Sequence, residues 1–265
     1  MKIPFSIPTL TAEDERLIEI ADQLGSDWAS QCFDAAFTHL EFAHKLVDID
    51  PAMAIFRAIT AEEEAATALF RALHLRNYPK SNLLLPHNHL HKAAVFPFIM
   101  GVVKHTSYLK VNGIKSVKLG VPKNEDPPRL KLYFVLGGHL EGVVANPEPP
   151  LNMKITEGDE KLPPDYRRAL LGTIGSDGFS NIRKYFERKA NQRNLMLYAG
   201  QNGLKQPAVN PTDYLIQQKL CVVTILKAAL LIWPYTEIQP FVSDLIEAFL
   251  SATQKAQNQA TEYDT

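Results

Sequence analysis

The spacing of apolar residues predicts three helices in the first part of the chain. Over residues 27–47 apolar side chains recur at helical intervals, and polar side chains occupy the opposite face. Residues 50–78 begin with an N-cap aspartate followed by a proline, and they are rich in alanine and other strong helix formers. A third helix is expected from about residue 85 to residue 104, with a kink or break at Pro97.

The pattern changes between about residues 107 and 157. Residues 130–136 and 151–155 alternate between apolar and other side chains, which is typical of strands, and proline-rich loops separate these segments. Asn112-Gly113 is a favoured pair for a tight hairpin turn. The sequence therefore predicts a small antiparallel meander of about three to five strands.

Helical spacing returns after this segment. The further helices are expected over residues 166–171, 180–198, 212–233 and 237–256. The apolar run 220–233 contains polar residues and is shorter than the ~20 residues of a membrane span, so it predicts a buried helix and no membrane contact. We expect a mainly α chain, a helical bundle that forms a single domain over 1–265 with a β-rich insertion at about 107–157.

Composition and charge narrow the class of protein. With 46% hydrophobic residues the chain can build a sizeable core, and its formal net charge of -1 gives no general attraction to nucleic acid or to anionic membranes. Only Cys32 and Cys221 are present, both within apolar helical patterns, so no disulfide framework is expected. Residues 1–10 lack the pattern of a signal peptide, and we expect a cytoplasmic location.

Three consecutive glutamates, residues 62–64, lie on the predicted second helix, where at least one must face inward. A buried carboxylate is costly unless it is paired, so a donor is expected nearby. His91 shares a face of the third helix with His87 and is the predicted donor, with Lys92 and His89 as alternatives. These groups form either a structural network between two helices or a catalytic or ligand-binding site.

The histidines also raise the question of a metal site. His87 and His91 are four residues apart, and Glu41 and His44 form a Glu-x-x-His step on the first helix. However, Glu41 lies on the polar face of its helix, and no second such step occurs in the sequence. Neither a metal nor a cofactor is therefore expected.

The same helix pair carries a family resemblance. The segment AEEEAATALFRAL (61–73), followed by HNHLHKAAVFPF (87–98), resembles the HEPN helical superfamily, in particular its abortive-infection type V branch, over about residues 27–105. The resemblance implies a helical bundle, often a homodimer, used in toxin, phage-defence or nucleotide-binding modules. Many members are RNases, which implies a prokaryotic defence or stress role connected with RNA.

The usual Arg-x(4–6)-His motif of those RNases is absent, because no arginine of the chain has a histidine at that distance downstream. RNA cleavage would need another arrangement, in which an arginine binds phosphate and a histidine transfers the proton. The candidate catalytic residues are then Glu63, Arg71, His87 and His91. The candidate ligand-binding residues near them are Arg76, His89 and Lys92.

A basic segment offers a second route to nucleic acid. Its cations are Arg183, Lys184, Arg188, Lys189 and Arg193, and two aromatic residues lie among them. Cations at this density can follow a phosphate backbone, and a tyrosine can stack on a base, so Arg183, Arg188 and Arg193 are candidate RNA ligands. The alternative is a solvated helix face.

Two hypotheses therefore remain, and the sequence does not decide whether the protein is an enzyme. In the first, a HEPN-like protein binds RNA or a nucleotide. In the second, a non-catalytic scaffold binds a protein partner through its apolar helices and β insertion.

Overall fold

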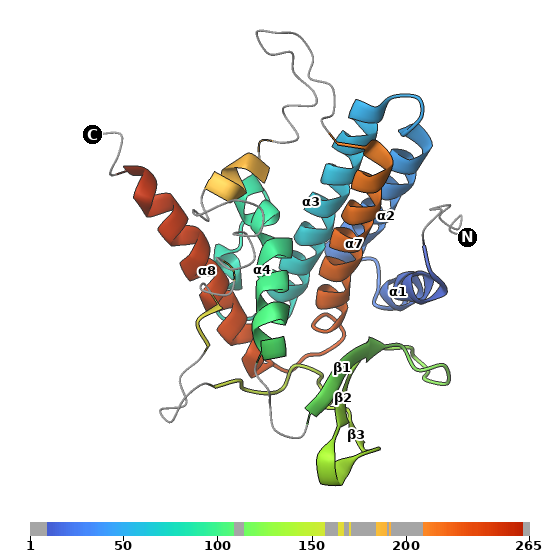
Figure 1. The fold of residues 1–265 in the computed structure, drawn as a ribbon, viewed down its shortest axis with the longest axis vertical. Coiled ribbons are helices and arrows are strands. Elements are labelled where there is room, and N and C mark those ends of the chain that lie inside the picture. Colours follow the sequence, from blue (N-terminus) through green and yellow to red (C-terminus); the bar gives the residue numbers. More distant parts are fainter. Residues whose placement is uncertain are drawn as a thin grey trace.

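The computed structural model of the protein describes residues 10–108, 114–156, 164–166, 170, 184–189, 191 and 209–261. Within these ranges the architecture is a helical bundle with a small antiparallel sheet at one end (Figure 1). The mainly α fold class with a β insertion is thereby confirmed.

Helix α3 (Pro51–Leu75) is the central element of the bundle. It packs against α2 (Trp28–Leu46), α7 (Pro211–Leu230) and α4 (His89–Tyr108) (Figure 1). The Asp50 carboxylate accepts a hydrogen bond from the Met53 N–H, and Pro51 occupies the first turn, as predicted. Most of its alanines are completely buried, which allows the neighbouring helices to approach closely.

Helix α4 begins at His89, later than predicted. The reason is local, since the Asn88 side chain accepts hydrogen bonds from the backbone N–H groups of Leu90 and His91 and so caps the helix. Pro97 lies inside α4, and the helix continues past it, so a complete break is excluded. Helix α8 (Pro240–Thr261) packs against α4.

Helix α1 (Ala12–Gln23) was not expected from the sequence. Thr11 and Asp14 form a reciprocal capping box, and Leu17 and Ile20 bury its apolar face. Lys219 of α7 lies 3.0 Å from the Asp14 carboxylate and ties the two helices together. The Thr-x-x-Asp pattern followed by apolar residues at helical spacing is the signal that predicts such a helix.

The sheet consists of β1 (Ile114–Gly120), β2 (Lys131–Leu136) and β3 (Val144–Ala145), in the order β1-β2-β3. The β1–β2 pairing runs from Ile114 opposite Leu136 to Gly120 opposite Lys131, with an irregularity after Ile114. Short 3₁₀ turns occur at Ser81–Leu83 and at Gly138–Leu140. The Asn112-Gly113 turn lies outside the described residues.

The predicted strand at 151–155 is wrong. Leu151, Met153 and Ile155 instead pack, partly buried, against the main apolar core, and the Leu151 N–H donates to the Gln239 side chain (2.7 Å). Leu130 is completely buried in the same core. The insertion is thus joined to the bundle by apolar contacts at its base, while its strands lie outside the bundle (Figure 1).

The later helices follow the prediction where they are described. Helix α7 lies within the predicted segment 212–233 apart from its first residue, and residues 166, 170, 184–189 and 191 are helical. The remaining residues of the predicted helices 166–171 and 180–198 lie outside the described residues. No described helix combines the length and apolarity needed to cross a membrane.

Candidate functional site

The three consecutive glutamates of α3 face three different neighbours. Successive helical residues are rotated by about 100°, so Glu62 points toward α7, Glu63 toward α4 and Glu64 toward α2, where it adds to the effect of burial in raising the pKa of Cys32. The Glu62 and Glu63 residues are only 5% and 8% exposed. The prediction that at least one glutamate faces inward is confirmed, and two of them are buried.

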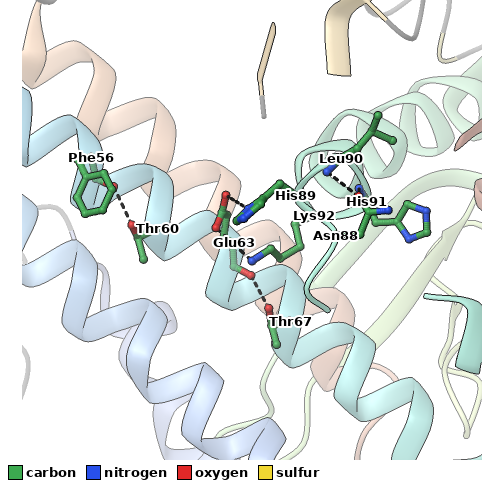
Figure 2. A network of polar contacts seen from close by, with 9 residues as sticks. All are labelled: Phe56, Thr60, Glu63, Thr67, Asn88, His89, Leu90, His91 and Lys92. Carbon is green, nitrogen blue, oxygen red and sulfur yellow. Dashed lines mark hydrogen bonds and ion pairs between the residues drawn. The ribbon is translucent and has the colours of Figure 1, made fainter. Parts of the chain in front are cut away.

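Glu63 contacts two side chains from the start of α4, one histidine and one lysine (Figure 2). His89 Nδ1 lies 2.9 Å from one carboxylate oxygen, and Lys92 Nζ lies 3.1 Å from the other. His89 and Lys92 are three residues apart and therefore share a face of the helix. Because Nδ1 faces a carboxylate, it carries the proton and donates it.

His91 is not the partner of Glu63, so the predicted pairing is wrong. Its ring lies on another face of α4, where Nδ1 accepts a hydrogen bond from the Leu85 N–H (3.3 Å). The ring also packs edge-on against Phe249 of α8, with centroids 6.0 Å apart. Burial, with a smaller effect from His87, lowers the pKa of His91, in agreement with an uncharged acceptor.

Glu62 is held by residues that are distant in the sequence. Lys189 Nζ lies 2.7 Å from one of its oxygens, and Gln218 Nε2 of α7 donates to the other at 3.0 Å. Burial alone would lower the pKa of Lys189, but the adjacent Glu62 carboxylate raises it above its ordinary value. Lys189 therefore remains charged at neutral pH.

The two glutamates line a common pocket. Its walls are Ile59, Glu62, Glu63, Lys92, Ala93 and Lys189. The pocket leaves room for about one water molecule. His89, next to it, has a side chain that is 41% exposed, so a partly accessible imidazole backed by a carboxylate lies beside two ammonium groups. Such a set can bind a small anion or accept a proton.

The other predicted catalytic residues do not join Glu63. Arg71 lies over the Trp28 ring of α2, His91 faces α8, and His87 is exposed in the segment before α4. Arg76 Nε donates to the Trp233 carbonyl oxygen (2.6 Å) and fastens the end of α3 to the segment after α7. Of the predicted site residues that the structure describes, the pocket gathers Glu63, Lys92 and the adjacent His89.

The basic segment meets this pocket. Residues 184–189 are helical, with Phe186 completely buried, Lys184 and Arg188 exposed, and Lys189 directed to Glu62. Arg183 and Arg193 lie outside the described residues. Sequence reasoning did not connect Lys189 or Gln218 with the glutamates, since no local spacing links residues so far apart.

The cysteines and the metal-ligand residue types offer no further chemistry here. Burial raises the pKa of Cys32 to about 12, and burial raises the pKa of Cys221 as well, so neither is a thiolate nucleophile at neutral pH. Across the described ranges, no three histidine, cysteine, aspartate or glutamate side chains form a group that could hold a metal ion.

Comparison with known proteins gives no further assignment. The resemblance to the HEPN superfamily stays a prediction, and the glutamate pocket with its basic neighbour is the basis for a functional proposal. No family model matches this chain, and no curated protein and no solved structure matches it.

Proposed function

We propose that this protein binds RNA along the exposed face of the helical segment 184–189 and the adjoining rim of the pocket beside Glu62 and Glu63. One observation carries the proposal. The 2.7 Å contact between Lys189 and Glu62, which are 127 residues apart in the sequence, joins the basic segment to the glutamate and histidine cluster.

The charge distribution of this segment supports a phosphate-binding surface. Lys189 is anchored inward, whereas Lys184 and Arg188 are exposed on the same short helix. Because the net charge of the chain is -1, attraction to nucleic acid must come from such a local patch. Half-buried Tyr185, whose ring contacts Phe186, adds an aromatic group beside the cations.

The size of the pocket favours the RNA backbone over a mononucleotide as its ligand. A space for about one water molecule cannot accept a nucleobase. A phosphate of the RNA at the rim can instead contact Lys92 or Lys189, while the rest of the RNA strand lies over Lys184 and Arg188. The HEPN resemblance supports the same ligand and a role in prokaryotic defence, and His89, backed by Glu63, is the group suited to proton transfer if RNA is cleaved.

The test is the binding of a fluorescein-labelled single-stranded RNA, measured by anisotropy over a range of salt concentrations. The double variant Lys184→Glu, Arg188→Glu should bind at least ~10-fold more weakly, and the salt slope should fall by about 1.4 for two lost contacts. The matched control is Lys115→Glu, Lys118→Glu on exposed β1, which makes the same charge change. Absent binding at low salt, or equal loss in the control, would refute the proposal.

A second candidate function, a protein-interaction module, is favoured by the sheet. Two exposed apolar side chains, Val117 (54%) and Leu119 (37%), lie on one face of β1. Under this alternative the protein does not bind RNA at low salt. Val117→Lys combined with Leu119→Lys would then dissociate a homodimer, detected by light scattering.

A further inference from the structure

The interface between α2 and α3 contains a series of polar contacts on the side of α3 that faces away from Glu62 and Glu63. The two helices are antiparallel, so the start of α2 lies beside the end of α3. The contacts along this interface pair Trp28 with Arg71, Cys32 with Glu64, and His39 with Arg57.

Arg71 differs from the other two charged residues of this series. Burial and the nearby Glu64 carboxylate raise the pKa of the Cys32 thiol, which places Glu64 beside it, and Arg57 Nη1 lies 3.1 Å from His39 Nδ1. The Arg71 guanidinium carbon lies 3.3 Å from the centroid of the Trp28 ring, and the guanidinium makes no hydrogen bond or ion pair with any described residue. The buried Nε of Arg57 lacks a partner within the described ranges as well, so the distinguishing feature of Arg71 is that its Nη groups also have none there and are the donors left for a ligand.

We infer that Arg71 and Trp28 form a binding site for an oxyanion carried on a flat ring. A guanidinium packed over an aromatic face uses only its π surface, which leaves the N–H groups in its plane for a bidentate carboxylate or phosphate. Trp28 is 58% exposed and offers an aromatic surface beside the cation. Its place at the first residue of α2 adds the positive end of a helix.

Among the described residues, no acidic side chain forms an ion pair with Arg71. Asp27, the nearest carboxylate along α2, accepts the Ser30 N–H at 3.0 Å as the helix cap. Neither Asp27 nor Glu64 forms an ion pair with Arg71 within the described part of the chain. The site is separate from the RNA surface proposed above and stands or falls without it.

Tryptophan fluorescence reports on this site directly. The chain has two tryptophans, and Trp233 is only 1% exposed, so a ligand that stacks at the surface changes the emission of Trp28. The full chain is titrated with AMP, a phosphate on a flat ring, and with benzoate, a carboxylate on a flat ring. Adenosine and inorganic phosphate are the controls that lack one half of this chemistry, and calorimetry provides a readout independent of fluorescence.

We expect AMP, benzoate or both to bind saturably, and adenosine and phosphate to bind at least ~10-fold more weakly. Arg71→Met should remove this binding. Arg71→Lys should weaken it several-fold, because lysine keeps the positive charge but lacks the planar pair of N–H donors that binds an oxyanion bidentately. Arg57→Met is the matched control, since Arg57 lies on the same helix near Phe42 but already contacts His39. Lys184→Glu, Arg188→Glu should leave AMP binding unchanged.

Three results would overturn the inference. The first is the absence of saturable binding of both AMP and benzoate up to about 10 mM. The second is adenosine binding as tightly as AMP, which would show that the phosphate oxyanion contributes nothing to binding. The third is unchanged binding in an Arg71→Lys protein whose melting midpoint matches the wild type.

Discussion

Ion pairs occur at similar distances in two very different regions of the molecule. In the helical bundle Lys189 lies 2.7 Å from Glu62, and these side chains are only 22% and 6% exposed. On the sheet Lys115 lies 3.0 Å from Glu141, with side chains 63% and 69% exposed. Distance alone therefore does not rank their importance. Water can replace a lost partner more readily on the open sheet than in the mostly buried bundle.

The largest effect is expected from Glu62→Ala. Removing the carboxylate leaves Lys189 and the Gln218 amide without their partner in a mostly buried site, which should cost about 3 kcal/mol in the free energy of unfolding. Urea denaturation followed by circular dichroism measures this change.

The matched control removes both charges together. Glu62→Leu combined with Lys189→Leu should recover most of the lost stability, because well-packed apolar residues can replace a buried ion pair. If Glu62→Ala costs less than about 1 kcal/mol, the pair behaves like a surface pair and the comparison between the two regions fails.

A smaller loss is expected from His91→Ala. This change leaves the Leu85 N–H without its acceptor and removes the ring packed against Phe249, so stability should fall by about 1–3 kcal/mol. His87→Ala, at an exposed position nearby, should leave the melting midpoint almost unchanged. Equal midpoints for His91→Ala and the wild type would contradict the contact.

His91 should also make the stability of the protein depend on pH. Burial holds the pKa of His91 below its ordinary value of 6.5, so below that pH the unfolded chain binds more protons than the folded protein. The contribution to stability is therefore complete above about pH 6.5 and decreases as the pH falls toward the folded pKa. Between pH 7.5 and 5 the free energy of unfolding should fall more steeply for the wild type than for His91→Gln. Parallel curves for the two proteins would refute this role of His91.

The smallest effect is expected from Lys115→Ala. Its exposed contact with Glu141 is open to solvent, and stability should change by no more than about 0.5 kcal/mol. A loss above about 2 kcal/mol, measured by the same urea titration, would show that the sheet region depends on its ion pairs as strongly as the bundle does.

The helices that local patterns define were predictable. Asp50, Pro51 and the alanine-rich sequence after them define α3, and its apolar stripes place glutamates in the core. Residues 151–155 have the alternating pattern of a strand, but they pack on the core without forming a strand. A period-two pattern also suits an extended segment that buries every second side chain. Helix α1 also has a local signal, the Thr11–Asp14 capping box, but the apolar pattern that follows it covers only a short helix.

The partners of the buried charges were less predictable. His91 was the expected partner of Glu63, yet His89 and Lys92 fill that role, because the rotation of α4 relative to α3 decides which face meets the glutamate. That rotation depends on the packing of α8 and on the Asn88 cap, and neither can be inferred from the spacing of histidines.

The sequence by itself determined that this chain is mainly helical with a small β insertion, and that carboxylates would be buried on α3, because helix propensity and amphipathic spacing are local properties. Only the tertiary structure decided which cations meet those carboxylates. Lys189 and Gln218 reach Glu62, and Arg71 meets Trp28, across long separations in the chain. Such contacts follow from how the helices pack against one another, and the local pattern of residues does not encode that packing.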